Sequence, residues 1–104
     1  MSKLKVTMLN REFKALSDPT RRKILQFLSA GDLTAGEIAA HFNSSWPTIS
    51  HHLEVLKSAG LVTAERNGQH IKYSANLSVM HEIAAWFTEF VDKPKGKKTR
   101  EKKT

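Results

Sequence analysis

The stretch SSWPTISHHLEVLKSAG, residues 44–60, combines a helical apolar pattern with a polar front end. If each residue turns a helix by about 100°, Ile49, Leu53 and Leu56 fall within about 60° of one another. These three residues therefore predict one buried stripe. The opposite side of the same helix, about 180° from Ile49, carries Pro47, His51 and Ser58.

The first two turns of this helix offer short hydrogen-bonding side chains, namely Ser45, Thr48, Ser50 and His51. A DNA recognition helix needs such a front end, because its N-terminal turns enter the major groove and its side chains reach base edges. The free N–H groups at the helix start also favour a phosphate. These four residues are therefore candidates for contact with DNA. The alternative is an ordinary surface helix, because Ser and Thr gather at helix caps in any protein.

Two helices are expected near the N-terminus. Apolar residues at helical spacing predict the first over roughly residues 6–17. Asp18 has the chemistry of an N-cap and Pro19 suits the first helical position, so a second helix starts there. Gly31 is expected to end it.

Two further helices have the spacing of a helix-turn-helix. Thr34 and Glu37 stand at the T-x-x-E spacing of a capping box, which opens a short third helix. Ser45 is the expected N-cap of the fourth helix, and Gly60 is expected to end it.

A β-hairpin and a last helix follow. Asn67-Gly68 separates two strand-like runs, residues 61–66 and 69–74, and predicts a two-residue type I′ turn. The last helix is expected over Ser78 to Val91. Four helices, a hairpin and a helix indicate a mainly α (α+β) fold, the winged helix-turn-helix.

The hairpin is the wing of this predicted fold. Basic and amide side chains at its tip suit contact with phosphates or the minor groove. The alternative is an ordinary solvated hairpin. The residues assigned to the wing contact are Arg66, Asn67, Gly68, Gln69, His70 and Lys72.

The length and composition of the chain indicate which broad classes of protein it can belong to. The chain has 104 residues, enough for one small domain, and no apolar run near the roughly 18 residues that span a membrane. Its start lacks the apolar core of a secretory signal. It contains no cysteine, which excludes disulfides and thiolate metal sites. We expect a cytoplasmic protein with no membrane partner.

The positive charge is concentrated at the C-terminus. Residues 93–104 hold seven Lys or Arg and one Glu, a net +6 of the chain's +7. We therefore expect residues 1–92 to form the DNA-binding and dimerisation domain, and residues 93–104 to be a basic, disordered tail. The tail is expected either to be a solvated end or to bind phosphates without reading bases.

The final helix is too apolar for a lone surface helix, and a domain this small cannot bury all of its apolar side chains within one subunit. We therefore predict a homodimer through the first and last helices. The alternative is an intramolecular core, which claims some of the same side chains. The residues predicted at the dimer interface are Leu9, Phe13, Ile83, Trp86, Phe87 and Phe90.

The chain resembles the ArsR/SmtB family of winged-helix repressors, and most closely its SdpR-like autorepressor branch. The resemblance covers roughly residues 10–90 and rests on four segments: ALSDPTRRKIL (15–25), LTAGEIAAHF (33–42), SSWPTISHHLEVLKSAGLV (44–62) and RNGQHIKYS (66–74). It implies a homodimer that enters successive major grooves of an operator and represses transcription by occluding it. It also implies base reading by the four residues at the helix front, and phosphate contacts by Arg22 and Lys57.

This sequence departs from the metal-sensing members of that family. The helix reading TAGEIAAHF has no cysteine, and the last helix lacks the D-x-H and H-x-x-E spacings of the family's other metal sites. His51 and His52 are adjacent, so on a helix they diverge by about 100° and cannot chelate one ion together. His52 falls at the edge of the buried stripe and is expected to be packed. We predict no metal site.

Other classes of function are less well supported. The chain shows no recognisable catalytic set, no glycine-rich phosphate loop and no paired carboxylates, so we predict neither an enzyme nor a cofactor. A winged-helix module that binds proteins instead of specific DNA is the main alternative. A sensor with an unidentified small-molecule or protein effector is another. The sequence does not name the operator or the signal.

Overall fold

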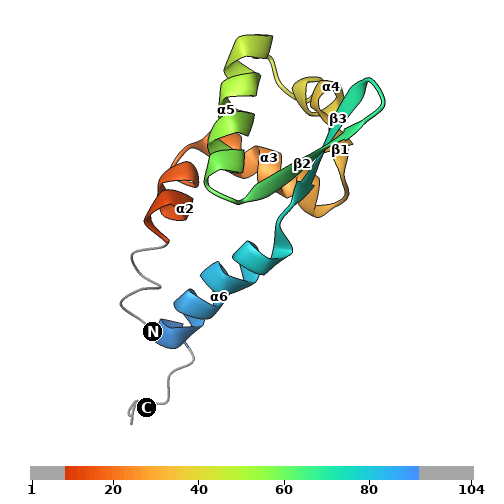
Figure 1. Ribbon diagram of the computed structural model, residues 1–104. Coiled ribbons are helices and arrows are strands. Elements are labelled where there is room, and N and C mark those ends of the chain that lie inside the picture. The colour runs from red at the N-terminus through yellow and green to blue at the C-terminus, as the bar shows by residue number, and fades with distance from the viewer. Residues whose placement is uncertain (1–8, 92–104) are drawn as a thin grey trace.

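Eight helices and strands follow one another in residues 9–91, the part of the chain that the computed structural model describes (Figure 1). They are α2 (Asn10–Ala15), α3 (Pro19–Ser29), β1 (Leu33–Thr34), α4 (Ala35–Ala39), α5 (Trp46–Ser58), β2 (Val62–Asn67), β3 (His70–Ala75) and α6 (Leu77–Val91). The helix-turn-helix of α4 and α5 is followed by a hairpin wing, so the predicted fold class is confirmed. The expected tail, residues 93–104, lies outside the described residues.

The predicted caps start three of the helices. The Asp18 carboxylate accepts hydrogen bonds from the backbone N–H groups of Thr20 and Arg21, at 2.8 and 3.1 Å. Thr34 and Glu37 form the reciprocal capping box that the sequence predicts. At α5, Ser45 Oγ accepts a hydrogen bond from the backbone N–H of Thr48 at 3.4 Å.

The predicted stripe anchors α5 in the core. Ile49, Leu53 and Leu56 are buried, and they join a cluster with buried residues of α3, α4 and β2. Burying each such aliphatic side chain stabilises the fold by about 1.5–3 kcal/mol. Because the stripe fixes the rotation of α5 about its axis, the opposite face must point outward.

The sheet has the strand order β1-β3-β2, with all neighbours antiparallel. The sequence did not predict β1. Its two residues, Leu33 and Thr34, pair with Tyr73 and Lys72 of β3 and so join the start of α4 to the wing. A strand of two residues carries no alternation, so only tertiary pairing reveals it.

The predicted turn of the hairpin is wrong by one residue. Asn67 pairs with His70, so the two turn residues are Gly68 and Gln69 instead of Asn67 and Gly68. Gly68 has φ +69°, and both two-residue hairpin turns require positive φ at this first turn position. Glycine meets that requirement without steric cost. Asn67 therefore extends the strand instead of turning it.

The first helix is shorter than predicted. It covers Asn10–Ala15 instead of residues 6–17, and residues 6–8 lie outside the described part. Leu16 and Ser17 leave the helix because Asp18 must be extended to cap α3. The short α2 lies beside α5, and Figure 1 shows α6 leaving the molecule at the end opposite to the hairpin turn.

The last helix agrees with prediction to within one residue, and Asn76 holds its start. The Asn76 side-chain amide donates to the carbonyl of Gly60 at 2.9 Å, which links α6 to the end of α5. Within residues 9–91, no helix combines the length and the hydropathy that a membrane span needs.

Candidate nucleic-acid interface

The front end of α5 lies at the same end of the molecule as the hairpin turn (Figure 1). Ser45, Thr48 and His51 are exposed there, and Ser50 is half-buried. The hydroxyls of Ser45 and Thr48 are 3.0 Å apart and share a hydrogen bond. Each hydroxyl keeps free lone pairs and can rotate toward another partner. Ser45 and Thr48 thus form one accessible polar pair at the start of α5, with the exposed His51 in the next turn of the helix.

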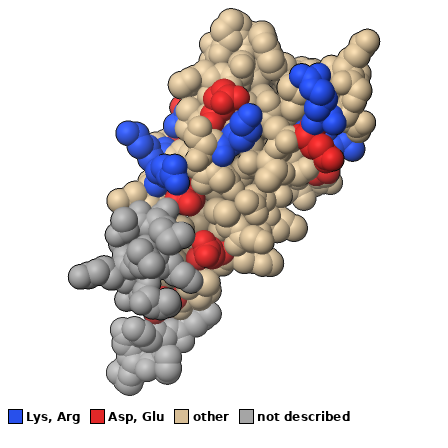
Figure 2. All heavy atoms as spheres, in the orientation of Figure 1, with Lys and Arg blue, Asp and Glu red and all other residues tan. Residues whose placement is uncertain are grey.

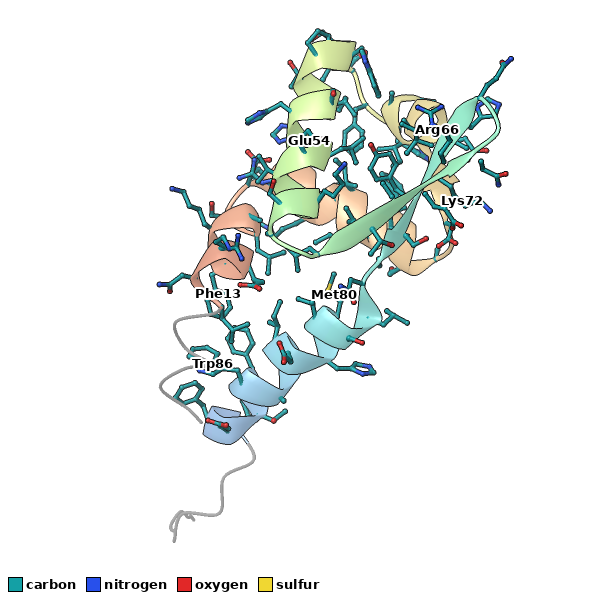
Figure 3. The ribbon with its side chains drawn as sticks, in the orientation of Figure 1. Phe13, Glu54, Arg66, Lys72, Met80 and Trp86 are labelled. Atoms are coloured by element: carbon teal, nitrogen blue, oxygen red, sulfur yellow. The ribbon has the colours of Figure 1, made fainter. Side chains whose placement is uncertain are left out.

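The wing carries both signs of charge. Arg66, Asn67, Gly68, Gln69 and His70 are exposed at its tip, and Lys72 is half-buried further along β3. Figure 3 shows Arg66 and Lys72 on the two strands of the hairpin. In Figure 2, acidic side chains lie directly beside the Lys and Arg side chains of this region. The wing is therefore suited to a few local phosphate contacts and does not form a uniformly positive face.

The two phosphate contacts predicted outside the wing lie away from the front of α5. Lys57 is near the C-terminal end of α5, and its Nζ is 3.6 Å from a carboxylate oxygen of Glu54. Arg22 donates from Nη1 to the carbonyl of Leu16 at 2.7 Å. It lines a groove against α6, on a different side of α3 from α5.

Arg21, which sequence reasoning overlooked, is the arginine that reaches α5. Its Nε donates to the carbonyl of Ala15 at 2.7 Å, and its Nη1 donates to Nδ1 of His52 at 3.2 Å. The same His52 nitrogen is 3.9 Å from Asp18 Oδ2. These three polar side chains therefore connect the end of α2 and the start of α3 to the middle of α5.

This connection requires a neutral His52, because arginine can only donate and Nδ1 must accept. Burial lowers the pKa of His52; Asp18 opposes that effect, while Arg21 and His51 add to it. Partial burial raises the pKa of Asp18, but hydrogen bonds from the backbone N–H groups of Arg21 and Thr20 and the positive charge of the Arg21 side chain outweigh that effect, so the net shift of the pKa is downward. The cluster is thus arranged as carboxylate, neutral imidazole and guanidinium.

We predict that this histidine makes folding stability pH-dependent in a defined window. The pKa of His52 is lowered in the folded chain from the ordinary histidine value of 6.5. As pH falls below 6.5, the unfolded chain therefore binds a proton at His52 more readily than the folded chain does. The stability contributed by neutral His52 is complete above that pH and is lost as pH falls below it. The urea midpoint should fall more between pH 7 and pH 5 for the wild type than for His52→Gln. His81→Gln, at an exposed position, should behave like the wild type; equal slopes in all three proteins would contradict the prediction.

A shallow groove runs between α2 and α5 beside the predicted base-reading face. It has a volume of about 450 Å³, and Arg11, Lys14, His51 and Glu54 lie along it. Arg11 and Lys14 are exposed cations that sequence reasoning missed. The residue spacing within α2 alone does not show that the side of this helix carrying Arg11 and Lys14 borders α5. Arg11 and Lys14 therefore place positive charge beside His51 and the C-terminal half of α5.

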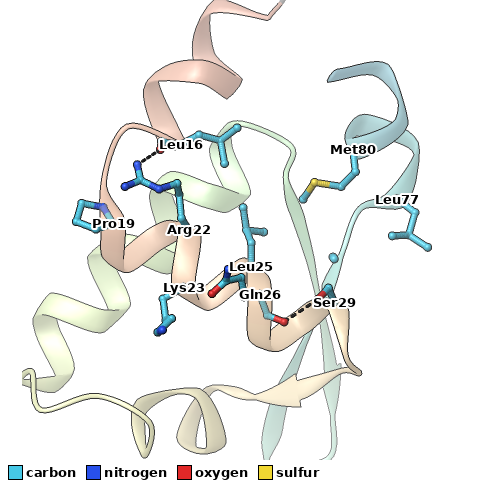
Figure 4. Close-up of a pocket in the computed structure, with 10 residues that line it drawn as sticks. Leu16, Pro19, Arg22, Lys23, Leu25, Gln26, Ser29, Leu77 and Met80 are labelled. Carbon is cyan, nitrogen blue, oxygen red and sulfur yellow. Dashed lines mark hydrogen bonds between the residues drawn. The ribbon is translucent and has the colours of Figure 1, made fainter. Parts of the chain in front are cut away.

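A second groove, of about 600 Å³, lies between α3 and the start of α6 (Figure 4). Its walls are mainly apolar, with Leu25 from α3 and Leu77 and Met80 from α6. Arg22 and Lys23 supply positive charge at its edge. The groove has room for a small amphipathic molecule.

Two of the six residues predicted at the dimer interface are buried within the single chain. Leu9 and Ile83 have exposed fractions of 1% and 8%, so they belong to the core of the single chain. They do not lie on its surface, as the predicted dimer interface required. Their position follows from packing of the chain's own helices, which the spacing along one helix does not reveal.

An aromatic cluster remains at the surface. The ring centroids of Phe13 and Trp86 are 5.2 Å apart, and Figure 3 shows the two side chains meeting between α2 and α6. Phe87 and Phe90 extend the cluster along α6 with exposed fractions of 49% and 65%. Such a continuous exposed aromatic face is typical of a protein–protein contact.

No group of three or more His, Cys, Asp or Glu in residues 9–91 is arranged to hold a metal ion. The rings of His51 and His52 are tilted by 53° with centroids 5.8 Å apart. His52 is packed as predicted. His41 is exposed, and its ring stacks on Phe27 with centroids 4.0 Å apart.

Comparison with known proteins connects this geometry to transcription. Residues 18–64 match the family model described as bacterial regulatory protein, arsR family. The chain is 53% identical over 85 residues to the transcriptional repressor SdpR of Bacillus subtilis (strain 168), covering 82% of this chain and 94% of SdpR.

Two solved structures share the fold. A crystal structure of an ArsR family transcriptional regulator aligns with a TM-score of 0.75 and 30% identity, over 83% of this chain and 89% of that one. A homodimeric winged helix-turn-helix DNA-binding domain from Mycobacterium bovis, solved by NMR, aligns with a TM-score of 0.67 and 27% identity, over 86% and 89%.

Proposed function

The chain belongs to the arsR family of bacterial regulatory proteins, and we propose that it represses transcription as a homodimer that binds and occludes a double-stranded DNA operator. The observation that carries this proposal is the orientation of α5. Its apolar stripe is buried, so Ser45, Thr48 and His51 face outward at the end of the molecule that also presents the wing. A helix front and a wing at one end match the major-groove and backbone contacts of a winged helix.

Two observations support the homodimer. Phe87 and Phe90 leave a large aromatic area exposed on α6, and the Mycobacterium bovis relative of the same fold is homodimeric. A dimer also explains useful specificity from one short helix, because two half-sites roughly add their binding free energies. We place the repressor in the cytoplasm, where its operator lies, and assign it no enzymatic activity.

Footprinting of the purified protein on its own genome, including its own promoter, tests the function. We expect protection of a short site with two related halves, and binding that weakens steeply as salt rises. A site over its own promoter would support autorepression. Specific binding at no site, with the protein folded and dimeric, would favour a winged-helix protein-interaction module instead.

The groove of Figure 4 favours a second role, as a sensor within the same family. Arg22 and Lys23 beside an apolar wall suit an effector that has an apolar body and an anionic group. A screen of small carboxylates for release of operator DNA tests this role. Loss of the response in Met80→Arg, which fills the groove, would locate the effector there.

Deleting residues 93–104, which lie outside the described residues, should weaken binding to all DNA and leave site preference unchanged. The segment holds seven Lys or Arg and one Glu, so it can attract phosphates but cannot read bases. If half of these charges engage, the slope of log K against log salt should fall by roughly 3. Titrations at four salt concentrations measure the slope. An unchanged slope would mean that the tail does not touch DNA.

A further inference from the structure

Trp46, the first residue of α5, is an exposed aromatic side chain with no place in the core. It is 50% exposed, and it is absent from the buried cluster and from the apolar residues packed against that cluster. The other large apolar side chains exposed within residues 9–91 are Leu77, Phe87, Phe90 and Val91, and all belong to α6. Trp46 is thus separate from the proposed dimer surface, and folding does not account for its position.

Trp46 forms one wall of a surface hollow of about 340 Å³. Thr34 and Gly36, at the start of α4, line the hollow together with Gln69 and His70 of the wing. The hollow therefore lies between the front of α5 and the hairpin turn, the two elements assigned to DNA.

The shape of duplex DNA indicates what crosses this hollow. A winged helix that places α5 in the major groove brings its wing to the neighbouring minor groove or its backbone. One sugar–phosphate strand separates two adjacent grooves of a duplex. That strand must therefore pass between α5 and the wing, which is the place of the hollow.

We propose that this hollow holds the sugar–phosphate strand, with Trp46 as its main contact. This inference rests on the proposed function. The indole face offers an apolar surface for a deoxyribose, and its Nε1–H can donate to a phosphate oxygen. Gln69 and His70 can donate from the opposite wall. Because sugar and phosphate are the same at every base pair, Trp46 adds affinity without sequence preference.

Gly36 gives an independent way to test the hollow. It lies in α4, and a Cβ built on it meets no atom within 4 Å. A larger side chain there should not disturb the fold and should raise the helix propensity of α4. Gly36→Gln is therefore expected to leave the urea midpoint equal or higher while it fills the hollow and weakens DNA binding.

Fluorescence reports directly on Trp46, because the chain has only two tryptophans. In Trp86→Phe, which leaves Trp46 as the single tryptophan, emission should change on addition of operator DNA and also of random duplex at low salt. In Trp46→Phe, the emission of Trp86 should change little.

Affinity measurements complete the test. Trp46→Ala should weaken binding to both operator and random duplex by more than about tenfold for each half-site, because it loses one hydrogen bond to a charged phosphate and also the apolar contact with the deoxyribose. Trp46→Phe loses the same hydrogen bond but keeps an apolar face, so its loss should be smaller than that of Trp46→Ala. A loss confined to the operator would mean that Trp46 reads a base, and it would overturn the backbone assignment.

Three other outcomes would also overturn it. Unchanged affinity in Trp46→Ala and Gly36→Gln, with the wild type binding its operator, would remove the hollow from the interface and leave the proposed function intact. A lowered urea midpoint in Trp46→Ala with no fluorescence response to DNA would give Trp46 a structural role. If the wild type binds no duplex at all, both this inference and the proposed function fail.

Discussion

Replacing Phe87 and Phe90 together by Asp should convert the protein to a monomer and weaken operator binding by at least about 100-fold. Both side chains are among the most exposed apolar groups of α6, with exposed fractions of 49% and 65%. In a dimer they would be covered by the second copy, and a carboxylate in such a contact loses its hydration without gaining a partner. A monomer offers one recognition helix and therefore one half-site, so most of the specific binding free energy is lost.

The structure supplies a matched control for this prediction. Ala85 and Thr88 are also exposed on α6, but they lie on the side of the helix away from the aromatic stripe. Ala85→Asp/Thr88→Asp adds the same charge to the same helix and should leave both dimerisation and DNA affinity close to wild type. Sedimentation equilibrium gives the mass, circular dichroism checks the fold, and titration with a labelled operator gives the affinity.

The two double variants separate a dimer contact from a local effect on α6. If both lower affinity equally and both remain dimeric, the aromatic face is not the interface. If the Phe87→Asp/Phe90→Asp protein is monomeric yet binds the operator as tightly as the wild type, a homodimer is not needed for operator binding. Either result would contradict the proposal at a different step.

The sequence predicts features that depend on local chemistry. The caps at Asp18, Thr34 and Ser45 follow from side chains that bond backbone groups within three residues, so no distant contact is needed to find them. The buried stripe of α5 follows from its own spacing. For the same reason the order of helices and hairpin was predictable.

Features that depend on contacts between distant segments were missed or misplaced. Arg21 and Arg22 are adjacent and chemically identical, and only the packing of α2, α5 and α6 decides that Arg21 reaches α5. Leu9 is in the core for the same reason. The hairpin register also depends on both strands, since Gly68 can occupy either turn position and strand pairing places it first.

Among the candidate base-reading residues, His51 offers the largest single-residue effect. Its side chain is exposed on the face of α5 opposite the buried stripe, so removing it creates no cavity. Imidazole can donate or accept a hydrogen bond at a base edge, and one good base contact contributes about 1–3 kcal/mol of discrimination. His51→Ala should therefore lower operator affinity by that amount for each half-site, while affinity for random duplex changes little.

His81→Ala is the matched control for this substitution, because His81 is exposed and belongs to α6 and not to α5 or the wing. It should leave binding to both DNAs unchanged, and neither variant should shift the urea midpoint by much. Parallel titrations of operator and random duplex at one salt concentration measure the two losses. An equal loss on both DNAs would show that His51 acts on the backbone beside Arg11 and Lys14, whose groove it shares. Base reading would then rest on Ser45, Thr48 and Ser50, whose hydroxyls accept and donate with less selectivity for one base.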